Sequence, residues 1–233
     1  MKKMNRAQHL LVLAACTAAL ATTGAIANPL RWAAAGDPQT MDPHSQNEGL
    51  TNSVNSQVYE FLMIRDKKLK LGPGLATEWK QIDSLTWQFK LRQGVKFHDG
   101  SPFTADDVVF SIERARAPTS QIRVYANQSG VARKIDTHTV EFKLPQVNPI
   151  FLDHVNQIMI MSKSWSEKNN CTTPLDYKNK EEKFTSLNAN GTGPYRLVSR
   201  QPDVKTIWKR NDAWWGKHEG NVTSVTYTSI KND

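Results

Sequence analysis

One short segment, GVKFHDGSPFTADDVVFS, concentrates side chains that could carry acid–base or metal chemistry between two apolar runs. It contains His98, Asp99, Asp106 and Asp107. Paired carboxyl groups that act in acid–base catalysis need separate placement across a cleft. Two adjacent aspartates do not give that placement, so the segment does not predict a catalytic pair.

The same residues have a simpler explanation in local structure. Thr104 is a favourable N-cap, Asp107 stands three residues later in the capping-box position, and Asp106 suits the positive end of the helix dipole. Asp99 precedes a glycine, which is typical of a turn. The segment therefore predicts a turn followed by a capped helix that runs to about Ala115.

The remaining reactive side chains form no recognisable constellation. Apart from His9 near the N-terminus, the histidines are spread far apart, without the spacing of metal ligands, at His44, His98, His138, His154 and His218. The sequence lacks G-x-S-x-G, H-E-x-x-H and a phosphate-binding glycine loop. We therefore expect a protein that is not an enzyme and has no resident metal or cofactor.

The N-terminal segment has the features of an export signal. A basic start is followed by an apolar stretch over residues 10–21 and by small residues that end at Ala27. This pattern predicts a secretory signal peptide, residues 1–27, with cleavage after Ala27. Leu-Ala-Ala-Cys at residues 13–16 leaves lipid anchoring at Cys16 as the alternative.

Charge and cysteine content narrow the class further. The chain carries 30 Lys and Arg against 22 Asp and Glu, and the predicted signal removes three of the basic residues. The remaining surplus is small and interspersed, which does not favour nucleic-acid binding. Only Cys171 follows the signal, so no intrachain disulfide is expected, and an exported protein of this kind suits a bacterial periplasm.

Hydrophobic periodicity predicts a mixed fold. Period-two alternation or short apolar runs predict strands at 29–35, 87–91, 139–144, 158–161, 195–199, 204–209 and 222–230. Helical spacing predicts helices at 50–62, 104–115 and 149–155, with a loop at 41–47. Antiparallel strands with occasional helices indicate an α/β fold of the mixed, α+β kind.

Five stretches together resemble a known family. They are TMDPH at 40–44, QVYEFL at 57–62, the long run at 72–111, GTGPY at 191–195 and KRNDAWWG at 209–216. In this order they resemble the bacterial extracytoplasmic solute-binding proteins of family 5, the peptide- and nickel-binding components of ABC importers. Trp214 stands where the family usually has Tyr. By itself the Trp214-Trp215 pair is compatible with an aromatic binding shelf or with a packed turn.

The resemblance implies a two-lobed fold of the type II periplasmic binding protein kind. Lobe I would comprise residues 28–70 and 190–233, and a family-specific second domain would comprise residues 71–189. Family members are roughly twice as long. We therefore expect a chain truncated to the N-terminal part, with most of the second lobe missing.

The resemblance also implies a function. The protein would capture short peptides (di- and oligopeptides) in the periplasm and deliver them to a membrane permease, as a monomer. The site residues that it implies lie in the loop after the first strand: His44, Ser45, Gln46, Asn47, Glu48 and Gly49. The alternatives are a nickel chelate (which His44 favours), haem, glutathione or another small solute, or a non-functional remnant.

Overall fold

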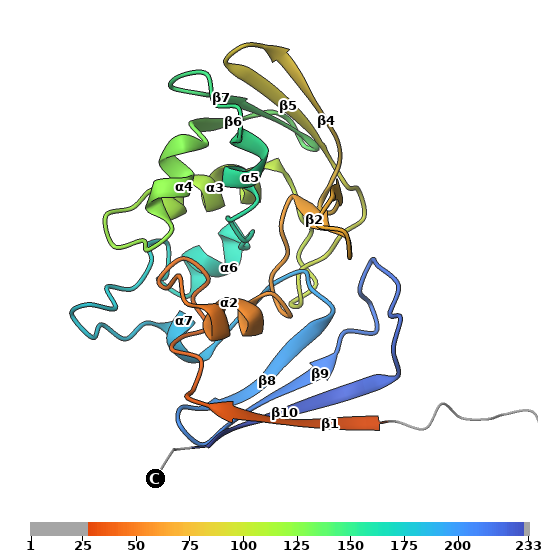
Figure 1. Ribbon diagram of the computed structural model, residues 1–233, viewed down its shortest axis with the longest axis vertical. Helices are drawn as coiled ribbons and strands as arrows, with labels where there is room; N and C mark the ends of the chain where they lie inside the picture. Colours follow the sequence, from red (N-terminus) through yellow and green to blue (C-terminus); the bar gives the residue numbers. More distant parts are fainter. Residues whose placement is uncertain (1–27, 231–233) are drawn as a thin grey trace, which may run out of the picture.

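The computed structural model describes residues 28–230 (Figure 1). The predicted signal peptide, with Cys16, lies outside the described residues, as do residues 231–233. Across the described part, none of the helices has both the length and the apolar character needed to span a membrane.

The first sheet brings both ends of the described chain together. Its strand order is β1-β10-β9-β8, with β1 parallel to β10 and the other pairs antiparallel. The strands are β1 (Asn28–Ala35), β8 (Tyr195–Gln201), β9 (Lys205–Arg210) and β10 (Val222–Ile230). All four were predicted from their apolar alternation, and the structure confirms them.

The second sheet comes from the middle of the chain. Its order is β4-β5-β7-β6, and every pair is antiparallel. The strands are β4 (Ala76–Asp83), β5 (Thr86–Leu91), β6 (Val131–Asp136) and β7 (Thr139–Lys143). The helix α3 (Ala105–Ala115), predicted from its cap, packs beside β6 and β7.

The remaining elements are short. They are the pair β2 (Met63–Arg65) and β3 (Leu71–Pro73), and the helices α2 (Gly49–Asn55), α4 (Arg123–Gln128), α5 (Phe151–Val155), α6 (Lys163–Lys168) and α7 (Phe184–Leu187). Figure 1 shows the helices between the two sheets. Since β2 pairs with β3 across the predicted domain boundary at residue 70, a hairpin joins the two sides of that boundary. The domain boundaries stay a prediction.

Aromatic side chains fill the core between the second sheet and its helices. Phe89 on β5 faces Val140 on β7, and its ring lies 5.2 Å from that of Phe142. The ring of Phe151, at the start of α5, lies 5.5 Å from Phe142. All four side chains are buried. Burial of side chains of this size contributes about 1.5–3 kcal/mol each, which makes this cluster the main apolar core.

The helix predicted at 50–62 is too long. The helix α2 ends at Asn55, and the carbonyl oxygen of Val58 accepts a hydrogen bond from the Gly193 N–H at 2.9 Å. A Cβ on Gly191 would lie 1.9 Å from the same oxygen. The GTGPY stretch thus packs its backbone directly on the chain after α2, and bonding to this distant segment replaces further helical turns.

The segment 158–161 is buried as predicted, but it is not a strand. Its backbone pairs with no strand: the Ile160 N–H donates to the carbonyl of Glu60 at 2.9 Å, and the Met161 N–H donates to Ser111 Oγ at 2.9 Å. The side chains alternate, with the two isoleucines in the core of the second sheet and the two methionines in that of the first. The segment therefore separates the two cores.

Candidate functional site

The opening aspartates are structural, as the turn-and-cap pattern predicts. Asp99 Oδ1 accepts hydrogen bonds from the N–H and hydroxyl of Ser101. Asp107 Oδ2 accepts from the Thr104 N–H at 2.8 Å, and its Oδ1 accepts from the Lys163 N–H at 2.9 Å. Asp107 thus caps α3 and also anchors the start of α6.

The six predicted site residues follow one another along the loop between β1 and α2, and they differ in exposure. The structure buries His44 and Ser45, half-buries Gln46 and Glu48, and exposes Asn47 and Gly49. The loop therefore begins inside the protein and reaches the surface at Gln46. We call residues 42–49 the solute loop from here on.

His44 uses both ring nitrogens inside the protein. Its Nε2 lies 2.9 Å from the carbonyl oxygen of Met159, and its Nδ1 lies 3.1 Å from Arg114 Nη1. Because a guanidinium only donates, Nδ1 accepts and Nε2–H donates, which fixes the neutral tautomer. Burial, and then the charge of Arg114, lower the pKa of His44 from 6.5 to about 3. The ring is neutral at neutral pH, and neither nitrogen is free for a metal.

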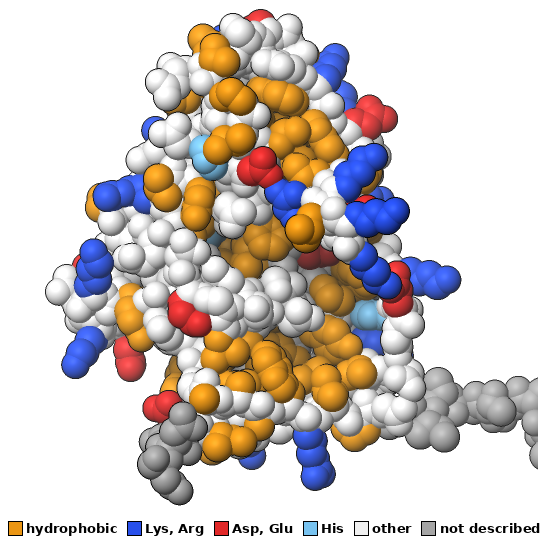
Figure 2. Space-filling model, viewed as in Figure 1, with side chains coloured by type: hydrophobic (Ala, Val, Ile, Leu, Met, Phe, Trp, Pro, Cys, Tyr) orange, Lys and Arg blue, Asp and Glu red, His pale blue; other side chains and the backbone are white. Residues whose placement is uncertain are grey.

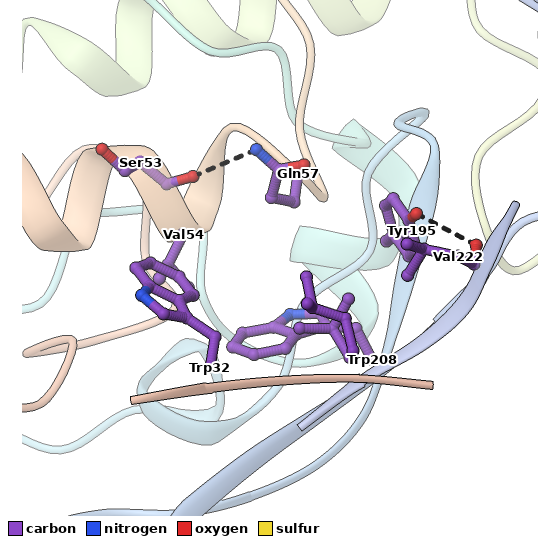
Figure 3. Close-up of a pocket in the computed structure, with 9 residues that line it drawn as sticks. Trp32, Ser53, Val54, Gln57, Tyr195, Trp208 and Val222 are labelled. Carbon is purple, nitrogen blue, oxygen red and sulfur yellow. Dashed lines mark hydrogen bonds between the residues drawn. The ribbon is translucent and has the colours of Figure 1, made fainter. Parts of the chain in front are cut away.

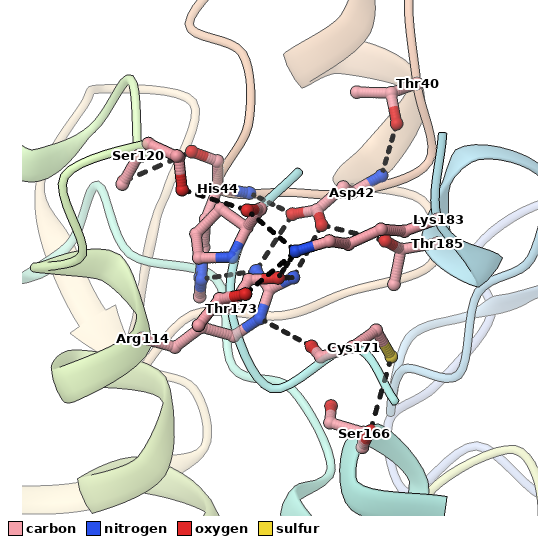
Figure 4. A network of polar contacts seen from close by, with 12 residues as sticks. Thr40, Asp42, His44, Arg114, Ser120, Ser166, Cys171, Thr173, Lys183 and Thr185 are labelled. Atoms are coloured by element: carbon pink, nitrogen blue, oxygen red, sulfur yellow. Dashed lines mark hydrogen bonds and ion pairs between the residues drawn. The ribbon is translucent and has the colours of Figure 1, made fainter. Parts of the chain in front are cut away.

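Arg114 on α3 is the centre of a buried polar network, the Arg114 hub (Figure 4). It pairs with Asp42, and both side chains are 0% exposed. Its five N–H groups have five acceptors: Asp42 Oδ1 at 2.9 Å, Asp42 Oδ2 at 2.5 Å, His44 Nδ1 at 3.1 Å, and the carbonyls of Cys171 and Thr173, each at 3.1 Å.

Both carboxylate oxygens of Asp42 also accept further hydrogen bonds. Its Oδ1 also accepts the His44 N–H at 3.0 Å, and its Oδ2 accepts the Thr185 hydroxyl at 2.9 Å. Burial by itself would raise the pKa of Asp42, but the charge and hydrogen bonds of Arg114 outweigh it and hold the pKa well below its usual range. The hub is therefore a fully ionised, fully bonded pair under the solute loop.

The far end of the solute loop is fixed by a helix cap. Glu48 is the N-cap residue of α2, and its carboxylate accepts from the N–H groups of Leu50 at 2.7 Å and Thr51 at 2.9 Å. The Thr51 hydroxyl donates to it at 2.8 Å. A carboxylate at this position also complements the positive end of the helix dipole.

A polar cavity of about 230 Å³ lies beside the solute loop. Its polar side chains are amides and hydroxyls: Asn47, Asn52, Ser53, Ser56 and Gln157. Amide groups can both donate and accept hydrogen bonds. The lining includes no carboxylate and no imidazole.

A second cavity, of about 240 Å³, lies between α2 and the first sheet (Figure 3). Trp32 and Trp208 flank it, and Tyr195 closes one side with its hydroxyl bonded to the carbonyl of Val222 at 3.1 Å. Figure 2 shows apolar side chains gathered on this part of the surface. The alternation of Leu30 and Trp32 on β1 was the sequence signal for this apolar face, and it was not recognised as a site.

The paired tryptophans are a packed turn and not a free aromatic shelf. Trp214 and Trp215 donate their indole N–H groups to Glu60 Oε1 at 3.0 Å and Oε2 at 2.8 Å. The Arg92 guanidinium lies 4.1 Å from the centre of the Trp215 ring. We call these four residues the Glu60 clamp. Burial raises the pKa of Glu60, and the hydrogen bonds act against this rise.

Within residues 28–230, no group of three or more His, Cys, Asp and Glu side chains is placed to hold a metal ion. Cys171 is buried, and burial raises the pKa of its thiol. A buried thiol of raised pKa is a poor nucleophile.

The fold and its buried loop anchor define a class: a mixed α/β protein with a polar loop beside a cavity and no reactive pair among the described residues. The model of the "Bacterial extracellular solute-binding proteins, family 5 Middle" matches residues 70–233, and the chain belongs to this family. Members of the family bind solutes for ABC importers and are not enzymes.

Curated relatives agree with this assignment. The glutathione-binding protein GsiB of Escherichia coli strain K12 is 29% identical over 240 residues. The alignment covers 99% of this chain and 44% of the relative, and GsiB of Shigella flexneri matches equally. This chain therefore spans less than half the length of the curated relatives that it matches.

Solved structures confirm the predicted mixed α/β fold. NikZ from Campylobacter jejuni, in complex with Ni(L-His), is 26% identical with a TM-score of 0.74, over 87% of this chain and 39% of that one. DppA from Helicobacter pylori, a periplasmic binding protein in complex with the peptide STSA, is 25% identical with a TM-score of 0.75, over 88% and 43%. A dipeptide-binding protein from Pseudoalteromonas sp. SM9913, in complex with Met-Leu, is 25% identical with a TM-score of 0.73, over 88% and 44%.

Proposed function

We propose that this protein captures short peptides for an ABC importer. The observation that carries this is the cavity beside the solute loop, whose polar lining consists of uncharged amides and hydroxyls. A peptide backbone presents alternating N–H and C=O groups, and side chains such as Asn47, Asn52 and Gln157 match both. Direct coordination of nickel favours imidazole ligands, which this lining lacks.

The solute loop supplies the proposed contacts in two ways. Gln46, Asn47, Glu48 and Gly49 stand at or near the surface, so they are the residues that we assign to the solute itself. The residues His44 and Ser45 are buried in the same loop, and we assign to them the role of supporting it. The second cavity, with Trp32 at its rim, would accept an apolar side chain.

The place of this step in the cell follows from the family and the N-terminus. We propose export by the signal peptide of residues 1–27 with cleavage after Ala27, action in the periplasm as a monomer, and delivery of the peptide to a membrane permease. The similar structure from Helicobacter pylori is also that of a periplasmic binding protein.

Glutathione is the second candidate, because the curated relatives described above are glutathione-binding proteins. It is itself a tripeptide, so the same amide-rich lining would accept it. The two candidates differ at the first residue: the γ-linked glutamate of glutathione has a free α-carboxylate beside its α-amino group, whereas an ordinary peptide has only the α-amino group there.

Thermal unfolding of the purified chain tests the proposal. The probes are Ser-Thr-Ser-Ala, Met-Leu, reduced glutathione and a nickel–histidine complex, each titrated to millimolar concentration. A peptide that binds the folded state raises its stability by about 2.7 kcal/mol at one hundred times Kd. We expect saturable stabilisation by the peptides and its loss in Asn52→Leu, with Asn179→Leu, remote from the cavity, as the matched control. Stabilisation by nickel–histidine alone, or by no probe, contradicts the proposal.

A further inference from the structure

We propose that Arg114 is a positioning residue for solute binding: through the Arg114 hub it fixes the start of the solute loop, so that Gln46 and Asn47 meet the solute in a single conformation. The Arg114 side chain is wholly buried and lies about 70 positions along the chain from the loop. This inference rests on the proposed function.

The first step is that most of the hydrogen bonds of Arg114 go to the solute loop. Three of its five hydrogen bonds go to loop atoms, two to Asp42 and one to His44. The other two go to the carbonyls of Cys171 and Thr173, and these bonds fix the orientation of the guanidinium. A displaced loop would leave a buried charge without its counter-ion, and this strongly disfavours alternative loop positions.

The second step is that the chain after α3 extends the same support. The carbonyl oxygen of His44 accepts a hydrogen bond from the Gln121 N–H at 3.0 Å and one from the Ser120 hydroxyl at 3.2 Å. Both residues follow α3, the helix that carries Arg114. One region therefore fixes the side chain and the backbone of His44 together.

The third step is that only a short part of the loop lies between its two fixed ends. Glu48 fixes the far end of the loop by capping α2, so three residues lie between the two anchors: the buried Ser45, and Gln46 and Asn47, which reach the surface. The Asn47 side chain accepts a hydrogen bond from Asn52 at 3.1 Å. A loop held at both ends is preorganised, and a solute that binds it does not have to restrict its backbone further.

The size of the effect follows from the backbone that is released. If Arg114 no longer holds the loop, solute binding must order at least one further residue. The free energy of ordering one residue corresponds to roughly a five- to thirtyfold increase in Kd. The contacts with the solute stay the same, so the change appears in affinity and not in which probe binds.

The test compares Arg114→Lys with wild type. Lysine keeps the positive charge but lacks the fork that bonds both oxygens of Asp42. Two quantities are measured: Kd for Ser-Thr-Ser-Ala by calorimetry, and amide hydrogen exchange of residues 42–49. The control is Val140→Ala, a core change in the second sheet that also lowers stability. Thr185→Val, which removes one neutral hydrogen bond to Asp42 Oδ2, is the milder variant that retains the ion pair.

We expect Arg114→Lys to weaken peptide binding five- to thirtyfold and to accelerate exchange in the loop, Thr185→Val to do so less, and Val140→Ala to change neither at a temperature where it is folded. Unchanged loop exchange in Arg114→Lys overturns the inference, as does equal weakening by Val140→Ala. If wild type binds no peptide, the proposed function fails, and the exchange measurement then decides separately whether Arg114 holds the loop.

Discussion

Two of the polar contacts that connect the segments around the first sheet to those around the second are built differently. The Arg114 hub is wholly buried and contains a complete ion pair, with five donors on five acceptors. The Glu60 clamp joins one buried carboxylate to the indole N–H groups of two half-buried tryptophans, and a half-buried Arg92 stacks on Trp215.

The difference shows how burial changes the value of a polar contact. In the hub, each charge depends on its partner, because a buried charge that loses its partner keeps its desolvation cost. In the clamp, two neutral indole N–H groups each donate to one carboxylate oxygen, so losing one of these bonds leaves no charge without its partner and costs less. The hub therefore fixes geometry firmly beneath the solute loop, while the clamp only fastens the loop between β9 and β10.

The largest expected effect comes from breaking the hub. Asp42→Ala leaves Arg114 buried without a counter-ion, and we expect a loss of about 3–5 kcal/mol in the free energy of unfolding. Urea titration measures it. Glu141→Ala is the control, since it breaks a pair with the exposed Arg133 and should cost below about 1 kcal/mol. Similar losses in the two variants would remove the distinction drawn here.

Acid should weaken the hub before it weakens the clamp. The folded pKa of His44 is lowered from 6.5 to about 3, so between these values the unfolded chain binds a proton that the folded chain does not, and stability falls as pH falls. The slope is about 1.4 kcal/mol per pH unit for this one group. His98 and Asp42, whose pKa values are also lowered, add to this loss. The raised pKa values of Glu60 and Asp107 act in the opposite direction.

The contribution of His44 is isolated by His44→Gln, whose amide keeps one donor and one acceptor but does not titrate. We expect the melting temperature of this variant to fall less steeply between pH 6.5 and 4 than that of wild type. Parallel curves for the two proteins would show that His44 is not the group responsible.

A smaller effect is expected at the clamp. In Glu60→Gln, the amide oxygen still accepts one indole N–H, but the amide nitrogen cannot accept the other. The expected loss is about 1–2 kcal/mol, the value of one hydrogen bond to a charged group. Urea unfolding followed by tryptophan fluorescence measures it, and a loss as large as that of Asp42→Ala would place the clamp in the same class as the hub.

The smallest effect sharpens the description of the hub itself. Arg114 bonds the backbone carbonyl of Cys171 and not its thiol, which instead lies 3.5 Å from the carbonyl of Ser166. Cys171→Ala should therefore cost less than about 1 kcal/mol and leave solute-loop exchange unchanged. A change in loop exchange would mean that the thiol takes part in the hub.

Local sequence was sufficient for several elements because their causes are local. The capping box at Thr104 and Asp107 identified the start of α3, and period-two alternation identified β5, β7 and β8 to β10. The Asp99 turn was equally readable. For the cap and the turn the bonding partners lie within a few residues, so the pattern contains the reason for the structure. For the strands the alternation marks which face is buried, although the partner strand can be distant.

Other features were invisible to periodicity because their partners are distant in sequence. The apolar spacing after Leu50 continues past Asn55, yet Gly193 bonds the carbonyl of Val58 and the helix stops. His44 was predicted in a solute loop, but its burial and tautomer depend on Arg114 and Met159. No spacing rule links these positions.

The sequence by itself determined the mixed α/β class, the positions of several strands and of the α3 cap and, through its motifs, membership of the solute-binding family. Tertiary structure alone decided which polar residues pair: it joined Asp42 to Arg114, turned two tryptophans onto Glu60, and left Asn47 and Asn52 beside a cavity. The physical reason is the distance along the chain over which each interaction acts. Propensity and capping act over a few residues, whereas a buried charge is stable only where the whole fold brings its partner to it.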